Sequence, residues 1–230
     1  MAIKICAISD MHGNLNFNID ACDLLLVCGD IVSLGAQTHK ESSINWFEKK
    51  FFPWADSQPC DKIIIIGGNH DRLICEYENE FRELVSRHDK LVYLSCEIYD
   101  YNGVRIYGTP MCKIFGNWWF MYSDEHQDKK YAEDAEKFKN IDIVVSHDSP
   151  YGVSDILLQQ DWPWCNGKHI GNMPLRRFVE NIKPKLLFHG HLHSTNHFEE
   201  KLGDTSVYNV SLLNENYERV YKPLYIDFEK

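Results

Sequence analysis

Apolar residues along the chain gather in short runs, and polar segments separate one run from the next. The runs are rich in β-branched residues and have the length of buried strands, so each of them predicts a strand. The predicted strands are Ile3–Ile8, Leu24–Cys28, Lys62–Ile66, Leu91–Leu94, Arg105–Tyr107, Ile141–Val145, Leu186–Phe188, Val207–Val210 and Leu224–Phe228. None of these runs approaches the roughly 20 apolar residues that a membrane-spanning helix needs.

Helical periodicity occurs between some of the predicted strands. The predicted helices are Glu41–Phe52, Leu73–His88, Lys129–Asn140 and Pro174–Ile182. The last follows Asn172, which suits an N-cap, and ends before Pro184. Strands alternate with helices in the first third of the chain, which predicts a parallel or mixed sheet covered by helices. Fewer helices separate the later strands, so a second sheet is expected, and no linker divides the single domain predicted over residues 1–230.

Two long stretches, Met111–Lys130 and Gln159–Met173, have no regular pattern and are rich in aromatic residues. Their rings are Phe115, Trp118, Trp119, Phe120, Tyr122, Trp162 and Trp164. Long loops in compact domains are usually functional or disordered, and this aromatic content argues against disorder. Two interpretations stay open: the rings form a small additional core, or some of them wall a substrate cleft.

The composition and charge of the chain exclude several function classes. Its 230 residues are 44% hydrophobic and 25% charged, which is typical of a globular protein and not of a disordered one. The N-terminus resembles no secretory leader and no cysteines have CxxC spacing, so a reducing cytoplasm is expected. The net charge of −10 disfavours stable nucleic-acid binding through a basic face. A phosphate substrate remains compatible with it if metal ions supply positive charge.

Polar clusters follow several of the predicted strands directly. They are Asp10-Met11-His12, Gly29-Asp30, Gly67-Gly68-Asn69-His70-Asp71, Ser146-His147-Asp148 and His189-Gly190-His191-Leu192-His193. Ligands of open α/β sheets bind outside the carboxyl ends of the strands, so these clusters are expected to converge. Carboxylates, an amide oxygen and imidazoles together suit divalent ions such as Mn, Fe or Zn. The donors exceed the needs of one ion, which indicates a dinuclear centre that activates a bridging water for attack at phosphorus.

The clusters, in this order, resemble the calcineurin-like metallophosphoesterase superfamily over nearly the whole chain. The motifs that carry the resemblance are Asp10-x-His12, Gly29-Asp30, Gly68-Asn69-His70-Asp71, His147 and Gly190-His191-x-His193. The segments 29–35, 108–120 and 208–227 resemble a narrower branch, the small metallophosphoesterase-domain-containing proteins that include cyclic-nucleotide phosphodiesterase-like members. The resemblance implies an α/β fold in which two mixed β-sheets form a sandwich flanked by helices (α/β/β/α).

The resemblance also implies residue roles. The positions that match the first metal site are Asp10, His12, Asp30 and His193. Those that match the second are Asp30, Asn69, His147 and His191, and Asp30 bridges the two ions. His70 matches a catalytic histidine that is not a ligand and that stabilises the transition state or protonates the leaving oxygen. The pKa of histidine near neutrality suits the second of these roles. The expected cofactors are two divalent ions, with Mn first and Fe, Zn, Ni, Co or Mg as alternatives.

The expected substrate is a small-molecule phosphate diester or monoester, with nucleotides and cyclic nucleotides as candidates. Phe115, Trp118 and Trp119 are the candidate substrate-binding residues. Two other interpretations are a phosphoesterase-fold scaffold that works by binding partners, and a metal-dependent nuclease. Every matched position is filled, which disfavours the scaffold, and no Lys/Arg cluster supports the nuclease.

The sequence departs from the family at two positions and lacks one feature. Asp148 stands where branch members typically carry glycine, and His189 occupies a position that is usually apolar. His189 is expected to be a packed core histidine, and a hydrogen-bond partner of a metal ligand is the alternative. The arginine pair of the Ser/Thr protein phosphatases has no counterpart, and Arg72 is expected to pair with an acidic neighbour. Protein phosphatase activity is therefore disfavoured.

Overall fold

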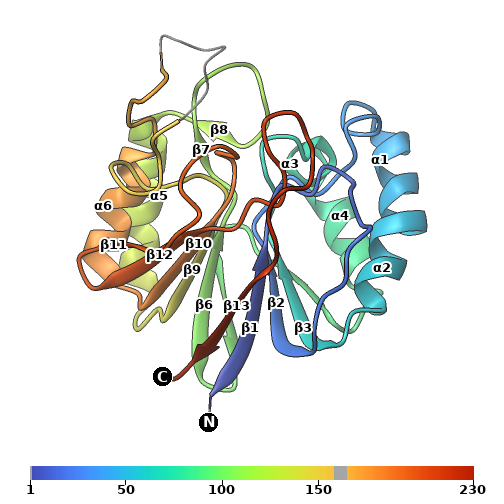
Figure 1. Ribbon diagram of the computed structural model, residues 1–230, viewed down its shortest axis with the longest axis horizontal. Helices are drawn as coiled ribbons and strands as arrows, with labels where there is room; N and C mark the ends of the chain where they lie inside the picture. The colour runs from blue at the N-terminus through green and yellow to red at the C-terminus, as the bar shows by residue number, and fades with distance from the viewer. Residues whose placement is uncertain (1, 158–164) are drawn as a thin grey trace.

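A computed structural model of the chain describes residues 2–157 and 165–230, in which two mixed β-sheets pack face to face between two layers of helices (Figure 1). The predicted α/β/β/α sandwich is confirmed. Trp162 and Trp164 lie outside the described residues. None of the described helices combines the length and the apolar character that crossing a membrane requires.

The first sheet has the strand order β13-β1-β2-β3-β4. Its strands are β1 (Ile3–Ile8), β2 (Cys22–Val27), β3 (Cys60–Ile65), β4 (Leu91–Tyr93) and β13 (Leu224–Phe228). Strands β1 to β4 run parallel and β13 pairs antiparallel with β1. The helices beside its outer face are α1 (Lys40–Trp46), the π-helix η1 (Phe47–Phe51), α2 (Phe52–Asp56), α3 (Arg72–Glu76) and α4 (Glu78–Val85).

The second sheet has the order β11-β12-β10-β9-β6-β5. Its strands are β5 (Glu97–Tyr101), β6 (Val104–Thr109), β9 (Ile143–Ser146), β10 (Leu186–His189), β11 (Glu200–Leu202) and β12 (Thr205–Asn209). The central strands run parallel, whereas β5 and β11 pair antiparallel at the edges. Helices α5 (Asp124–Lys137) and α6 (Met173–Ile182) cover its outer face (Figure 1). A small ladder joins β7 (Cys112–Lys113) to β8 (Met121–Tyr122).

Three hydrophobic clusters hold these layers together. The cluster between the sheets contains alternate residues of the strands, such as Ile5, Ile64 and Phe188, all fully buried. A second cluster joins the first sheet to helices α1 to α4, and a third joins the second sheet to α5 and α6. The central strands are therefore apolar on both faces, which explains why they stand out in the sequence as continuous apolar runs.

Some predicted helices differ from the structure. The helix predicted over residues 73–88 is wrong as one element, because Tyr77 leaves helical geometry between α3 and α4. Ile74 in α3 and Phe81 in α4 are both buried in the cluster that α1 to α4 form with the first sheet. Helix α5 begins five residues before the predicted Lys129, since the Ser123 side chain caps the first turn by accepting the His126 N–H. The Asn172 cap of α6 is confirmed: its side chain accepts the Leu175 N–H at 3.0 Å.

The strand pattern missed both antiparallel edge strands of the second sheet. Glu97–Tyr101 and Glu200–Leu202 are only partly buried and carry charged side chains, so neither gives a long apolar run. The stretch Met111–Lys130, which was predicted to be irregular, contains β7, β8 and the start of α5. All these differences lie away from the parallel strands that carry the polar clusters.

The parallel strands of both sheets have their carboxyl ends at the top of the sandwich in Figure 1. The Ser9 N–H, at the end of β1, donates to the Val210 carbonyl at 2.8 Å, and Ser9 forms an isolated bridge with Ser211. This contact brings the end of β1 beside the chain that leaves β12. The polar clusters of the two sheets therefore face one another.

Candidate metal centre

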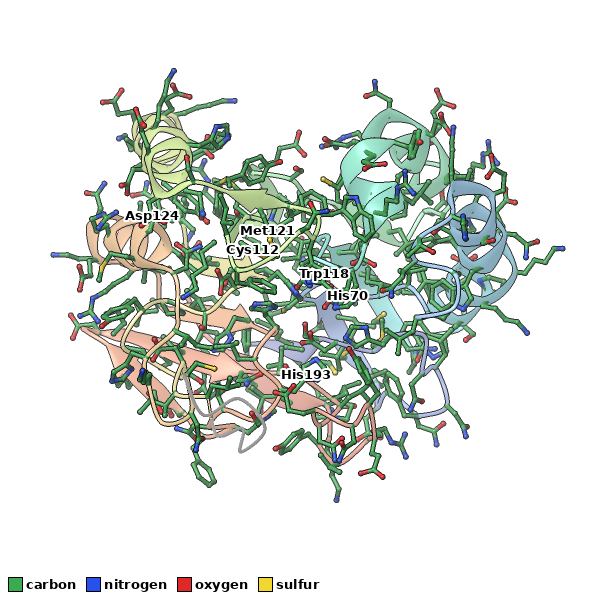
Figure 2. All side chains as sticks on the ribbon, turned by 90° about the horizontal axis from the view of Figure 1, so that it is seen from above. His70, Cys112, Trp118, Met121, Asp124 and His193 are labelled. Carbon is green, nitrogen blue, oxygen red and sulfur yellow. The ribbon has the colours of Figure 1, made fainter. Side chains whose placement is uncertain are left out.

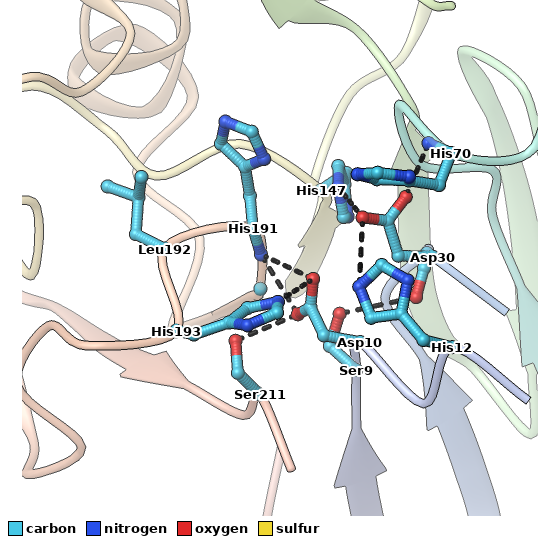
Figure 3. Close-up of polar contacts among 12 residues, drawn as sticks. Ser9, Asp10, His12, Asp30, His70, His147, His191, Leu192, His193 and Ser211 are labelled. Atoms are coloured by element: carbon cyan, nitrogen blue, oxygen red, sulfur yellow. Dashed lines mark hydrogen bonds and ion pairs between the residues drawn. The ribbon is translucent and has the colours of Figure 1, made fainter. Parts of the chain in front are cut away.

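The structure brings the predicted ligand residues together at the ends of β1, β2, β3, β9 and β10 (Figure 3). Asp10, Asp30 and His12 have left-handed backbone φ angles of 52°, 50° and 41°. Non-glycine residues adopt this conformation rarely, and it concentrates at functional sites. The turns lie just beyond the ends of β1 and β2, where the side chains of these residues gather.

A first group of donors lies around Asp10. Ligand atoms of Asp10, His12 and His193 lie within 4.8 Å of one another, and all three residues are buried. The His193 Nε2 atom is 3.2 Å from Asp10 Oδ1, and the His12 Nε2 atom is 3.6 Å from Asp30 Oδ2. The residues predicted for the first metal site thus form one cluster.

A second group lies around Asp30. Its atoms come from Asp10, Asp30 and His147, again within 4.8 Å of one another. The His147 Nε2 atom is 3.4 Å from Asp30 Oδ2 and 3.0 Å from Asn69 Oδ1. Asp10 belongs to both donor groups, and Asp30 contacts one histidine of each group. The carboxylates of Asp10 and Asp30 therefore link the two donor groups.

His191 stands at the border of this cluster. Its backbone N–H donates to both carboxylate oxygens of Asp10, at 3.1 and 2.9 Å. Its imidazole lies 5.2 Å from that of His147, points away from Asp10 in Figure 3 and belongs to neither donor group. The side chain would have to turn inward to meet the role predicted for it.

The donor set fits divalent ions by three observations. The Nδ1 atoms of His147 and His193 lie 2.7 and 3.1 Å from the carbonyls of Cys28 and Asn214, which leaves each Nε2 lone pair for the cluster. The buried His12 Nδ1 atom has no partner among the described residues. A Cβ atom at Gly190 would overlap the Asp10 carboxylate, so only glycine lets the backbone approach this closely.

The charges of the cluster shift its pKa values. Burial opposes ionisation of Asp10 and Asp30, yet neighbouring histidines outweigh it and hold the pKa of each carboxyl below its usual range. Burial likewise disfavours protonated His147 and His193, but the Asp30 and Asp10 charges raise their pKa values to about 10 and about 9. For His12, burial prevails and lowers the pKa to about 4.

These shifts predict how the metal-free protein responds to pH. Raised pKa values at His147 and His193 stabilise the fold below about pH 6.5, and this contribution is lost as the pH rises through about 9 to 10. The lowered pKa values of His12 and His191, about 4 and about 3, remove stability as the pH falls below about 6.5. We therefore expect the free energy of unfolding to be highest near pH 6.5.

Urea unfolding of chelator-treated protein at pH 5, 6.5 and 9 measures this profile. Metal binding needs deprotonated imidazoles, so the apparent affinity for Mn²⁺ should rise between pH 6.5 and 9 while the metal-free fold weakens. A metal-free protein that grows steadily more stable up to pH 9 would contradict the assigned charge pairs.

A cavity of about 870 Å³ opens from the donor cluster. Its walls include His70, Phe115, Trp118, Tyr217 and, among the described residues, a single lysine or arginine, Lys113. Trp118 lies beside His70, with ring centroids 4.3 Å apart, near the centre of the view in Figure 2. Phe115 lies 5.0 Å from the His191 ring. Both rings are exposed, which suits contact with a ligand.

The adjacent Trp119 is placed differently from what the sequence suggested, because it does not line this cavity. Its ring packs against the cluster that joins the first sheet to helices α1 to α4. Its Nε1 donates to Glu76 at 2.9 Å, and its backbone N–H donates to the Asn69 carbonyl at 3.2 Å. Trp119 thus anchors the loop that presents Trp118.

The two departures from the family pattern are buried polar residues. Asp148 accepts the Lys113 N–H at 2.9 Å and the Asn172 side chain at 3.1 Å, which ties β7 to the start of α6. His189 is fully buried as expected, but its Nε2 has no hydrogen-bond partner in the described structure. Arg72 pairs with Glu76 at 2.6 Å, as expected.

Sequence reasoning missed two residues of the cavity. Gln37 lies 2.6 Å from the His70 ring, and Tyr217 sets its ring edge-on to His12 at 4.9 Å. Neither belongs to a polar cluster at a strand end: Gln37 lies seven residues after Asp30, and Tyr217 lies in the loop between β12 and β13. Tyr217 stands out only by its left-handed backbone, with a φ of 59°, and the sequence does not show this.

Comparison with known proteins agrees with this geometry. The family model of calcineurin-like phosphoesterases matches residues 3–195. The chain belongs to the calcineurin-like phosphoesterase family. This membership, together with the carboxylate–histidine cluster, makes it a metal-dependent phosphoric ester hydrolase and confirms the resemblance drawn from the motifs.

The human metallophosphoesterase domain-containing protein 1 is 24% identical over 97% of this chain and 70% of its own length. An uncharacterized protein of Methanocaldococcus jannaschii is 28% identical over 91% of this chain and 88% of its own. The fold resembles a solved Thermus thermophilus protein (TM-score 0.64, 15% identity, 91% and 89% covered). It also resembles the phosphopantetheinyl hydrolase of Mycobacterium tuberculosis (TM-score 0.54, 14% identity, 93% and 90% covered).

Proposed function

We propose that residues 1–230 act as one cytoplasmic domain that uses two divalent ions to hydrolyse phosphodiesters of small, nucleotide-type molecules. The observation that carries the proposal is the donor cluster at a cavity with aromatic walls: Asp10 belongs to both donor groups, and Asp30 contacts a histidine of each. Buried thiols such as Cys6, Cys28 and Cys112 support the cytoplasmic setting.

The residues that would hold the first ion are Asp10, His12, Asp30 and His193, and those for the second are Asp30, Asn69, His147 and His191. Bound divalent ions, with Mn as the first candidate, would supply Lewis acidity that neutralises phosphoryl charge and makes water nucleophilic at neutral pH. Buried carboxylates and neutral imidazoles suit this role because they offset the positive charge.

His70 is proposed as the general acid. Its ring lines the cavity beside the donor cluster, 4.8 Å from the His12 ring, and belongs to neither donor group. The backbone N–H of His70 donates to Asp30 Oδ1 at 2.8 Å, which fixes the residue relative to the carboxylate between the two groups. A proton on the His70 ring can therefore reach the leaving oxygen of a phosphate held at the cluster.

A diester is proposed over a monoester because the cavity offers little compensation for extra negative charge. Lys113 is the one lysine or arginine among its described lining residues, and Glu215 adds a negative side chain. The exposed rings of Phe115 and Trp118 provide flat apolar surfaces on which a nucleobase can stack.

Hydrolysis of a cyclic nucleotide and of bis(p-nitrophenyl) phosphate by the Mn²⁺-loaded protein tests the proposal. We expect turnover of both, complete loss with a chelator, and recovery when Mn²⁺ is returned. Metal binding without turnover of any phosphodiester would favour the scaffold interpretation. Turnover confined to single-stranded oligonucleotides would favour the nuclease.

The neighbouring tryptophans give a matched pair for the stacking surface. Trp118→Ala should raise KM for the nucleotide about 10- to 100-fold, since stacking on an aromatic ring contributes about 1–3 kcal/mol per base, and it should spare the aryl diester. Trp119→Ala removes core packing and an anchor of the loop that carries Trp118, so it should lower Tm by several degrees, which Trp118→Ala should not do. If Trp118→Ala raised the KM values of the nucleotide and of the aryl diester equally, the role of Trp118 in nucleobase binding would be contradicted.

A further inference from the structure

Among the described residues, the imidazole of His70 has one hydrogen-bonded side chain, and that side chain is not a carboxylate. Its Nδ1 atom lies 2.6 Å from Oε1 of Gln37, which comes from the loop between β2 and α1. Trp118 covers the ring from one side and His12 meets it edge-on at 4.8 Å. Three neighbours from separate loops therefore define the orientation of His70.

The loop that carries Gln37 is braced on both sides. The backbone N–H of Gln37 donates to the Ser33 carbonyl at 3.1 Å, and the buried Ser43 hydroxyl donates to the Ala36 carbonyl at 2.7 Å. The Arg72 guanidinium, at the start of α3, donates to the Thr38 carbonyl. Arg72 follows His70 by two residues, so this contact couples the Gln37 loop to the turn that carries His70.

We propose that Gln37 is a positioning residue that orients His70 and fixes which ring nitrogen exchanges a proton. An amide oxygen accepts hydrogen bonds and never donates them, so the partner of Gln37 Oε1 is a protonated Nδ1. In the neutral ring the lone pair is then on Nε2, so Nε2 is the nitrogen that gains and loses the proton. This arrangement directs the acidic N–H of protonated His70 toward the cavity, whereas an unpartnered ring would rotate and change tautomer.

Gln37 acts here without adding charge. Glutamine offers the same acceptor geometry as a carboxylate, but it leaves the total charge of a site that already holds two buried aspartates unchanged. The role follows from the 2.6 Å contact and from the bracing of the loop, and it rests on the proposed function of His70 as a general acid.

Three variants test the proposal with two phosphodiesters. Gln37→Met keeps the length of the side chain and removes the acceptor, and Gln37→Glu keeps the acceptor. Thr38→Val changes an exposed neighbour in the same loop and serves as the control. One substrate has an aliphatic alcohol as its leaving group, which needs a proton, and the other releases p-nitrophenolate, which barely does.

For Gln37→Met we expect kcat with the aliphatic leaving group to fall about 10- to 100-fold, because a misdirected catalytic group loses efficiency on this scale. The KM, the metal content and kcat for the p-nitrophenyl ester should stay within about twofold of wild type. Gln37→Glu should restore the aliphatic kcat to within a few-fold, and Thr38→Val should match wild type.

A rise of KM with unchanged kcat would make Gln37 a substrate contact and overturn the proposal, as would equal losses for both leaving groups. Nitrogen-15 spectra of the Mg²⁺-loaded protein give a readout that does not need turnover. They should show the His70 proton on Nδ1 in wild type and its loss from that nitrogen in Gln37→Met. If wild type cleaves no phosphodiester, the proposed function fails, while an unchanged tautomer in Gln37→Met would overturn the positioning role itself.

Discussion

Replacing Asp30 with alanine is expected to empty both metal sites and to lower phosphodiester hydrolysis by more than about 10³-fold. The Asp30 carboxylate lies 3.6 Å from His12 Nε2 and 3.4 Å from His147 Nε2, so it contacts a histidine of each donor group. Removing one electrostatic stabiliser from an active site already costs about 10²–10³ in rate, and this substitution removes a ligand of both ions. Elemental analysis and steady-state kinetics after reconstitution with Mn²⁺ measure the two effects.

Two further variants make this result interpretable. Asp30→Asn keeps the shape of the side chain and removes its charge, so it should also lose metal if charge is what the ions need. Asp61→Ala removes an exposed aspartate of β3 whose carboxylate accepts from Tyr101, and it should bind metal as wild type does. A folded Asp30→Ala protein with the metal content of wild type would contradict the role of Asp30 as a shared ligand.

Replacing His70 with alanine is expected to leave both ions in place and to lower kcat about 10²- to 10⁴-fold, the usual contribution of a general acid. His70 lines the cavity but belongs to neither donor group, so metal binding does not need its ring. The loss should be greatest for an aliphatic leaving group and should shrink for p-nitrophenolate, which leaves without a proton. Paired kinetics with the two esters and elemental analysis check both parts.

The Gln37→Met variant provides a comparison for this experiment. It should show the same dependence on the leaving group with a smaller loss, because the ring of His70 is still present. If His70→Ala slowed both esters equally, His70 would act by stabilising charge on the phosphoryl group instead of by donating a proton. If the His70→Ala protein lost metal, His70 would be a metal ligand and its assignment as a non-ligand would be wrong.

The sequence predicted the cluster well because its residues follow parallel strands. Asp10, Asp30 and His147 each come directly after an apolar run, and the geometry of parallel sheets brings the ends of such runs to one edge. The same continuous burial made the central strands visible. Edge strands such as Glu97–Tyr101 bury less of their surface and left no such signal.

The walls of the cavity could not be predicted in the same way. Trp118 and Trp119 are neighbours in the sequence, and only the path of the loop exposes the first and packs the second against the core. Gln37 and Tyr217 reach the site from irregular loops whose conformation depends on tertiary contacts. Spacing along the chain carries no information on such contacts.

Anomalous diffraction from crystals of the Mn²⁺-reconstituted protein is the most direct test of the dinuclear centre. We expect two anomalous peaks per chain, one among Asp10, His12 and His193 and the other beside Asn69 and His147, with Asp30 between them. The ring of His191 should turn toward the second peak. A single peak in a protein with full phosphodiesterase activity would contradict the two-ion account.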